Sequence, residues 1–403
     1  MKQKNLHGLT WAILSISLLT VMAGAAMAPA LGAIKEHFDD CSSLTVQLIV
    51  SLPALFIIVT TFLFRPLCRL MRTRTLALTG LALYIVAGAG AYFVDDIVLL
   101  LILRALLGVS VGMVMPLSTG LLSFYFPPRM QSRLMGLSAA MNQMGGVVAT
   151  MLAGVLATIG WNYAFLVYLA GLIAIVLIAI FLPNEHLQSP QTAIEGTGNS
   201  EAAQAEAAST RPTTLKLLKR FHPSVTAMLF IMILFFVYPT NFALTAQEQG
   251  LSTLATTLIM VGLDVVAFFV GLAFGWLMNN LRVQMKYIAP LFFLGGYAAL
   301  ALVPGAAGMI FGSALIGLAN GAGVPYVNTI ASIKGGRDAA VTVMPLISAS
   351  LYLGQFLSPL IVSPLARLIG TPNAPYLVAL GIALLFLLQA HLTRHHHALP
   401  PKE

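Results

Sequence analysis

Charged side chains are scarce in this sequence. Only 8% of the 403 residues are charged, whereas 59% are hydrophobic, and a soluble globular protein carries roughly 25% charged residues. So few charges cannot cover the surface of a water-soluble fold of this length, which excludes the soluble classes of protein. The chain is therefore expected to lie in a lipid bilayer.

Period-two alternation of apolar and polar residues is also missing. Strands of membrane β-barrels alternate in this way over about ten residues. Here the apolar runs are continuous and exceed about 18 residues, the length at which a helix spans the hydrocarbon core. The 34 glycines and 21 prolines are compatible with helices, because both residues are commoner in transmembrane helices than in soluble ones. The expected fold class is an all-α membrane protein.

The sequence has few residues for cross-links, metals or catalysis. Its two cysteines, Cys41 and Cys68, fall on opposite sides of the membrane in the topology below, so we expect no disulfide and no metal site. The three histidines at 395–397 lie in a polar tail. The sequence contains no Gly-x4-Gly-Lys-Ser/Thr loop for nucleotides and shows no nucleophile–base constellation. We therefore expect no enzyme activity and no cofactor, and any transport must be driven by a gradient.

The apolar runs predict twelve transmembrane helices. The polar segment between the sixth and seventh is rich in Ala, Glu, Gln, Ser and Thr and cannot bury enough apolar surface to fold alone. The predicted spans lie near 9–33, 44–66, 75–94, 97–125, 133–159, 162–182, 221–245, 252–279, 284–303, 306–333, 340–366 and 372–392.

The predicted organisation is a six-helix bundle at 1–183, a cytoplasmic linker at 184–220, a second six-helix bundle at 221–394 and a tail at 395–403. Within the linker, "TTLKLLKR" can form an amphipathic helix on the lipid surface. The N-terminus also carries an Ala-x-Ala that resembles a signal-peptide cleavage site. Because the apolar run continues past it, and cleavage would leave an odd number of spans, we expect this segment to stay as the first helix.

Lys and Arg set the orientation. Of the 21 basic residues, only Lys35 and Arg367 fall outside, and Arg104 lies within a span, when both termini are placed in the cytoplasm. The positive-inside rule predicts this asymmetry. The net charge of +8 is thus a signal of topology and does not indicate nucleic acid. The expected location is the cell (inner) membrane, with the lipid bilayer as partner and a monomer as the default state.

The two halves of the chain are related by sequence. "LLGVSVGMVMPLSTGLLSFY" and "LIGLANGAGVPYVNTIASIK" superpose without gaps at an offset of 209 residues. This offset pairs Gly108 with Gly317 and Gly112 with Gly321. It places the fourth span on the tenth, and a second match places the fifth on the eleventh. The sequence therefore predicts two pseudo-symmetric six-helix bundles.

These features resemble the major facilitator superfamily over essentially the whole chain. "LILRALLGVSVG", with Arg104, Gly108 and Gly112, is similar to the motif of that superfamily in its fourth helix. "IGWNYAFLVYLAGL" is similar to its Gly-Trp-Arg-x-x-Phe signature, with Asn162 at the usual Arg. The resemblance implies transport by alternating access and is nearest to the drug and small-molecule efflux branch.

Two stretches depart from the superfamily patterns. The loop after the second span usually reads Gly-x-x-x-Asp-Arg-x-Gly-Arg, but here Phe64, Cys68 and Met71 replace the first Gly, the Asp and the second Gly. The fifth span lacks the Pro of the drug–proton antiporters. The cations of the loop, expected either to form a cytoplasmic gate or only to anchor the loop inside, are Arg69, Arg72 and Arg74.

Asp264 is the only carboxylate in any predicted span. It lies about 12 residues into the eighth span, roughly 18 Å deep, where a charged Asp costs on the order of 3 kcal/mol and usually faces the bundle interior or a wet cavity. One hypothesis is that Asp264 binds and releases a proton during transport. The other is that it only holds two spans together. Arg104 is a candidate counterpart across the cavity, and its alternative is to bond carbonyls within its own half.

Other polar residues of the spans are candidate substrate contacts, although each can equally form an interhelical hydrogen bond. The cavity implied by the superfamily would be largely apolar with few fixed charges, which suits amphipathic or lipophilic solutes. We expect a proton-coupled exporter of such small molecules, with an uptake permease or facilitator and a non-transporting receptor as alternatives. The candidate contacts are Asn142, Gln143, Tyr238, Asn241, Asn320, Tyr326, Asn328, Tyr352 and Gln355.

Overall fold

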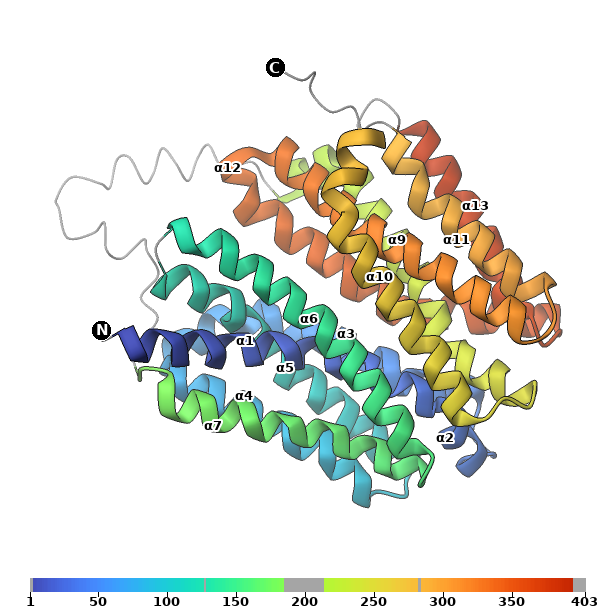
Figure 1. Cartoon of the computed structure of the whole chain (residues 1–403), viewed down its shortest axis with the longest axis horizontal. Helices are drawn as coiled ribbons and strands as arrows, with labels where there is room; N and C mark the ends of the chain where they lie inside the picture. Colours follow the sequence, from blue (N-terminus) through green and yellow to red (C-terminus); the bar gives the residue numbers. More distant parts are fainter. Residues whose placement is uncertain (1–2, 127, 185–213, 282–283, 394–403) are drawn as a thin grey trace.

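The computed structural model describes residues 3–126, 128–184, 214–281 and 284–393, and helices make up nearly all of these ranges (Figure 1). Twelve segments of the described chain are long and apolar enough to cross a membrane, as predicted. The linker residues 185–213 and the tail from 394 onward lie outside the described residues. The helices are α1 (Gln3–Ala25), η1 (Ala28–Ala30), α2 (Leu31–His37), α3 (Ser43–Leu70), α4 (Thr73–Ala89), η2 (Gly90–Phe93), α5 (Ile97–Tyr125), α6 (Pro128–Ala157), η3 (Trp161–Ala170), α7 (Gly171–Phe181), α9 (Thr214–Glu248), α10 (Thr253–Leu281), α11 (Met285–Leu302), α12 (Gly305–Ile369) and α13 (Ala374–Leu392).

Three parts of the fold differ from the expectation of one separate helix for each span. The first span is broken into α1, η1 and α2, and Pro29 lies in the η1 turn. The residues predicted as an amphipathic linker helix form the first turns of α9, because nothing in "TLKLLKRFH" breaks a helix before the apolar run begins. The tenth and eleventh spans belong to one helical element, α12.

α12 must fold back on itself. Its 65 residues would extend ~98 Å if straight, about three times the hydrocarbon thickness of a bilayer. A Cβ added at Gly323 would touch the side chain of Ile231, and one added at Gly354 would touch that of Met232. Both arms of α12 therefore pack at the same level of α9, so the chain reverses direction between Gly323 and Gly354, and the two candidate spans of this element are Gly305–Lys334 and Val343–Ile369.

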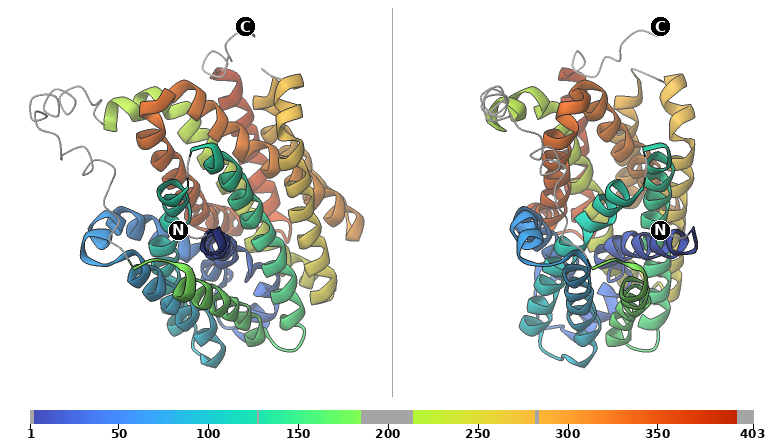
Figure 2. Two further views of the ribbon diagram at one scale, coloured as in Figure 1. Left: turned by 60° about the vertical axis from the view of Figure 1, so that its left-hand side comes forward. Right: turned by 90° about the vertical axis from the view of Figure 1, so that its left-hand side faces the viewer.

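Each half has a hydrophobic core of its own. One cluster of buried residues runs from Leu9 to Leu182, and a second runs from Phe221 to Phe386. Of the buried residues that the structure describes, only Ala243 and Ala28 belong to the cluster of the opposite half. Figure 1 shows the two groups of helices as separate lobes, and Figure 2 shows them from two further sides. This arrangement lets each half move as a body.

Glycine contacts show that the halves are built alike. A Cβ at Gly108 would lie 2.3 Å from the carbonyl oxygen of Pro53, and one at Gly317 would lie 2.6 Å from that of Leu263. Gly112 and Gly321 repeat the arrangement one turn further on, against Thr60 and Ala267. Only glycine allows the backbones to approach so closely. The fourth span therefore packs on the second as the tenth packs on the eighth, in agreement with the sequence repeat.

Candidate functional site at the seam between the halves

Side-chain hydrogen bonds join the two halves along a surface that we call the seam. The end of the molecule where α7 ends and α9 begins is called the linker end, and the opposite end, which carries α2 and the turn between α9 and α10, is called the far end (Figure 1). The bonds of the seam run from Thr150 to Asp264, Gln47 to Asn241, Ser363 to Gln47, Gln355 to Val50, Tyr352 to Met115 and Gln247 to Glu36.

Asp264 lies in this seam. It is in α10, on the side of the helix that meets α6 of the other half, and its side chain is partly buried. Thr150 of α6 donates a hydrogen bond from Oγ1 to Asp264 Oδ2 at 3.2 Å. The Thr150 side chain is itself buried. The one carboxylate of the predicted spans therefore contacts a neutral group from the opposite half, and movement of α6 away from α10 would separate the two.

A close helix contact lies between Asp264 and the far end. A Cβ added at Gly154 of α6 would lie 2.1 Å from side-chain atoms of Thr257 on α10. Thr257 is fully buried, and its hydroxyl donates to the carbonyl oxygen of Thr253 at 2.7 Å. The Thr257 side chain packs directly against the backbone of Gly154 here, so this contact separates Asp264 from the far end.

Gln47 of α3 also forms hydrogen bonds across the seam. Its Nε2 donates to Asn241 Oδ1 at 2.8 Å, and its Oε1 accepts a hydrogen bond from Ser363 Oγ at 2.5 Å. All three side chains are buried. Asn241 Nδ2 in turn donates to the carbonyl oxygen of Val237 at 2.9 Å. One amide of the first half therefore binds α9 and α12 of the second half.

Arg104 does not meet Asp264 in this conformation. Its guanidinium is fully buried in the first half and donates to Tyr168 Oη at 3.0 Å and to the carbonyl oxygens of Ala87 and Gly88 at 3.3 Å. It also lies over the rings of Phe165 and Tyr168, 4.9 and 5.0 Å from their centroids. The structure thus shows the alternative in which Arg104 bonds within its own half.

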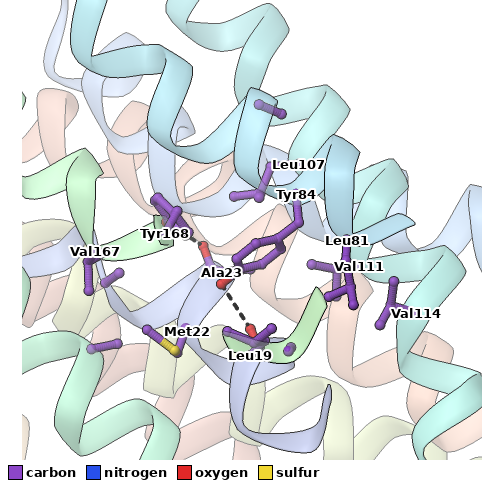
Figure 3. Packing of buried hydrophobic residues seen from close by; sticks show 14 of the residues in the cluster. Leu19, Met22, Ala23, Leu81, Tyr84, Leu107, Val111, Val114, Val167 and Tyr168 are labelled. Atoms are coloured by element: carbon purple, nitrogen blue, oxygen red, sulfur yellow. Dashed lines mark hydrogen bonds between the residues drawn. The ribbon is translucent and has the colours of Figure 1, made fainter. Parts of the chain in front are cut away.

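The contacts of Arg104 continue into α1. The Tyr168 hydroxyl donates to the carbonyl oxygen of Ala23 at 3.3 Å, and the Tyr84 hydroxyl donates to that of Leu19 at 3.2 Å. Figure 3 shows both hydroxyl groups directed at α1 among buried hydrophobic residues. Arg104 therefore connects α4, α5 and η3, and through Tyr168 it is linked to α1.

The remaining candidate substrate contacts lie either across the seam or within one half. Tyr352 donates to Met115 Sδ at 2.8 Å and Gln355 Nε2 donates to the carbonyl oxygen of Val50 at 3.3 Å, both across the seam. Asn142 accepts from Thr20 of its own half at 3.0 Å. Tyr238 is buried inside the second half, bonded to Ser313 at 2.7 Å.

The four other candidates lie elsewhere. Gln143 is exposed, and Asn328 is partly buried. Tyr326 is buried and lines a small cavity inside the second half. The Asn320 side-chain oxygen is buried and has no hydrogen-bond partner among the described residues.

The family is decided by comparison with known proteins. A model of the Major Facilitator Superfamily matches residues 13–359. The chain belongs to this superfamily. Comparison with curated proteins finds no match. The superfamily membership agrees with the fold, with its internal repeat and with the twelve candidate spans.

Solved structures of superfamily transporters share the fold at low identity. A bacterial homolog of the human lysosomal transporter Spinster, inward-facing and unoccupied, aligns over 100% of both chains with a TM-score of 0.75 and 16% identity. A D-xylose–proton symporter aligns over 98% of both chains, with a TM-score of 0.76 and 14% identity. A nucleoside transporter aligns over 95% of this chain and 99% of its own, with a TM-score of 0.71 and 10% identity.

The loop that carries the superfamily's cytoplasmic latch has a different arrangement here. Arg74 donates to the carbonyl oxygen of Ala179 in its own half, and Arg72 is exposed. The Arg69 side chain lies outside the described part of the chain. Cys68, at the position of the superfamily's Asp, is a free cysteine, and burial raises the pKa of its thiol. The Arg74 contact ties the loop to α7 of the same half.

Several residues of the seam were missed by sequence reasoning. Gln47, Thr150 and Ser363 are single polar groups in apolar helices, and their sequence context does not distinguish them from other interhelical hydrogen bonds. Of the three, Gln47 is the one that its sequence context could have indicated, because it is a long amide in the largely apolar stretch "VQLIVSLPALF". Within the described residues, no cluster of three or more His, Cys, Asp or Glu side chains could hold a metal ion.

Proposed function

We propose that this superfamily member is a secondary transporter that exports small amphipathic molecules in exchange for protons. The observation that carries the proposal is the place of Asp264. It is a carboxyl group at membrane depth, in the seam between two bodies, and its hydrogen-bond donor is the neutral hydroxyl of Thr150. A group in this position changes its surroundings each time the halves rock.

The proposed cycle follows from the contacts of the seam. With both termini in the cytoplasm, the far end is the outside and the structure is the outward-closed state. Opening of the far end separates Gly154 from Thr257 and Thr150 from Asp264, so that water reaches the carboxylate and a proton can bind. Closing the far end returns the neutral acid to the seam, at a lower cost than a charged one. Opening toward the linker end then releases the proton inside.

The substrate contacts proposed are the polar groups near the seam, Asn142, Tyr352 and Gln355, together with Asn320. They offer amides and a phenol beside apolar and sulfur-containing side chains such as Met115. The partly exposed Asn320 carries an acceptor oxygen that has no partner in the described structure. These groups suit an uncharged or weakly charged amphipathic solute, because none of them carries a fixed charge.

Uptake of a neutral polar solute is the second candidate function. The amide groups of the seam favour it, since Gln47, Asn241 and Gln355 are both donors and acceptors, as polyhydroxylated or heterocyclic solutes require. In that case Asp264 would carry a proton in the same direction as the solute. A receptor that binds without transport is the third candidate, and it predicts binding without flux.

We expect Asp264→Asn to abolish proton-coupled transport. The test uses inside-out vesicles that contain a pH-sensitive dye and a respiratory proton gradient, to which amphipathic compounds are added one at a time. A transported compound should collapse the gradient with the wild-type protein. With Asp264→Asn the response should fall to that of empty vesicles, because an amide cannot carry the proton.

Glu248→Gln is the matched control, since it removes a carboxylate from the exposed end of α9 in the same half. It should behave as wild type. An Asp264→Asn protein that still collapses the gradient would make Asp264 a structural residue. A solute that acidifies the interior of right-side-out vesicles when added outside would favour uptake with protons over export.

A further inference from the structure

A cavity opens at the far end, away from Asp264. Its volume is about 540 Å³, within the usual range of roughly 300–1,000 Å³ for small-molecule sites. Glu36, His37 and Trp161 line it from the first half, and Ser252, Thr253 and Leu254 line it from the second. The cavity therefore exists only while the far ends of the two halves are together.

Among the described residues that line this cavity, Glu36 carries the one fixed charge, and it is negative. Glu36 is exposed, and one of its carboxylate oxygens accepts a hydrogen bond from Gln247 Nε2 at 2.7 Å. His37 pairs with the exposed Asp95 at 2.5 Å. The neighbouring cation, Lys35, donates to the carbonyl oxygen of Asp39 at 2.6 Å and does not line the cavity. No Lys or Arg of the described chain is among the lining residues.

The aromatic wall of the cavity is fixed in place. The Trp161 ring stacks on His37 with centroids 4.6 Å apart and an interplanar angle of 26°. Phe38 and Phe165 meet it edge to face at 5.3 and 6.2 Å. Trp161 is nevertheless partly exposed. An indole held by three rings is preorganised, so a ligand that contacts it loses little side-chain entropy.

We propose that this cavity binds a small alkylated ammonium ion. A carboxylate and an indole in one cavity are the groups that attract such a cation, through charge and through the negative face of the ring. The neighbouring Leu254 and the small residues around it accommodate its alkyl groups. Because the lining comes from both halves, the bound cation holds the far end closed and slows the transport cycle.

The experiment measures binding of radiolabelled choline to the purified, detergent-solubilised protein without any gradient. Its neutral carbon isostere, 3,3-dimethylbutanol, serves as a competitor. Glu36→Gln should weaken choline binding about tenfold or more, and Trp161→Leu should weaken it as well. Asp40→Asn is the matched control, because it removes an exposed carboxylate from the same end of the molecule without changing the lining.

Tryptophan fluorescence tests whether the ligand binds beside Trp161. In a protein with Trp11→Phe and Trp276→Phe, which removes two exposed indoles, choline should change the fluorescence of Trp161. Glu36→Gln should abolish this change and Asp40→Asn should leave it. Competition by short-chain phosphatidylcholine at lower concentration than by choline would identify a lipid headgroup as the source of the ammonium group, and the reverse order would identify a free solute.

Equal choline affinity in wild type and Glu36→Gln would overturn the proposal, as would equal competition by the neutral isostere. The outcome is independent of the proposed function. Asp264→Asn should bind choline as wild type does, even if it transports nothing, because Asp264 lies outside the cavity lining.

Discussion

At the scale of single residues, Arg104 and Asp264 have opposite surroundings. Arg104 is fully buried, with two rings and three oxygen atoms around its guanidinium. Asp264 is partly buried and is bonded to one hydroxyl from another body. A group fixed from several sides within one half stabilises that half. A group with a single partner across the seam is free to change state when the halves move.

We therefore expect Arg104→Gln to destabilise the first half. The loss of the charge-assisted hydrogen bonds and the cation–π contacts should lower the free energy of unfolding by about 3 kcal/mol, measured by thermal unfolding in detergent. Arg104→Lys should recover only part of this loss, because an ammonium cannot donate in the fork geometry of a guanidinium. The double variant Arg104→Gln/Asp264→Asn should not regain transport, and a rescue would show that the two groups pair in another conformation.

At the scale of helices, the contact between Gln47 and Ser363 and the contact between Thr257 and Gly154 are related by the internal repeat. The offset that pairs Pro53 with Leu263 also brings Gln47 to the position of Thr257. It brings Ser363 to within one residue of the position of Gly154. α3 thus meets α12 through a bonded amide, while α10 meets α6 through a glycine. Equivalent positions of the two halves therefore meet twice near the far end. Gln47 and Ser363 meet through a hydrogen bond, and Thr257 and Gly154 meet through close packing.

The sequence predicted one part of this arrangement and not the other. The spans, the repeat of Gly108 and Gly317, and the depth of Asp264 follow from apolar length and spacing, which lipid imposes on every transmembrane helix. The partners across the seam do not follow from these patterns. The bond between Thr150 and Asp264 depends on how α6 and α10 are rotated about their axes, and a change of about one residue in that rotation would turn either side chain away.

Gly154→Ala tests the closure of the far end. The added methyl group would overlap Thr257, which is short, β-branched and fully buried and so has little freedom to move. The helices should separate, and the population of the state with an open far end should rise about tenfold. The measurement, in a protein with Cys41→Ser and Cys68→Ser, is the distance between spin labels at Phe93→Cys and Leu368→Cys, two highly exposed positions on opposite halves.

Gly262→Ala is the matched control, because a Cβ added there meets nothing within 4 Å. It adds the same methyl group to α10 and should leave the label distance unchanged. If Gly154→Ala gave the same distances as wild type, the contact between α6 and α10 would not govern the opening.

At the scale of the whole molecule, two separate cores joined by a polar seam favour rigid-body motion. Each cluster of buried residues lies almost entirely within one half, so rocking leaves the cores intact and breaks only the bonds of the seam. These bonds are few and are formed largely by neutral groups, and each contributes about 1 kcal/mol. The seam can therefore break and re-form during a cycle without loss of the fold.

A covalent link across the far end should stop such a cycle. Glu36 and Gln247 come from opposite halves and are hydrogen-bonded at 2.7 Å, so cysteines at both positions lie within reach of a short bifunctional thiol reagent. In a protein with Cys41→Ser and Cys68→Ser, cross-linking Glu36→Cys/Gln247→Cys should abolish flux, and a cleavable reagent followed by reduction should restore it. The single-cysteine variants should keep their flux after the same treatment. Continued flux in the cross-linked protein would mean that the substrate pathway does not pass through the far end between the halves, and alternating access by rocking would then be wrong for this chain.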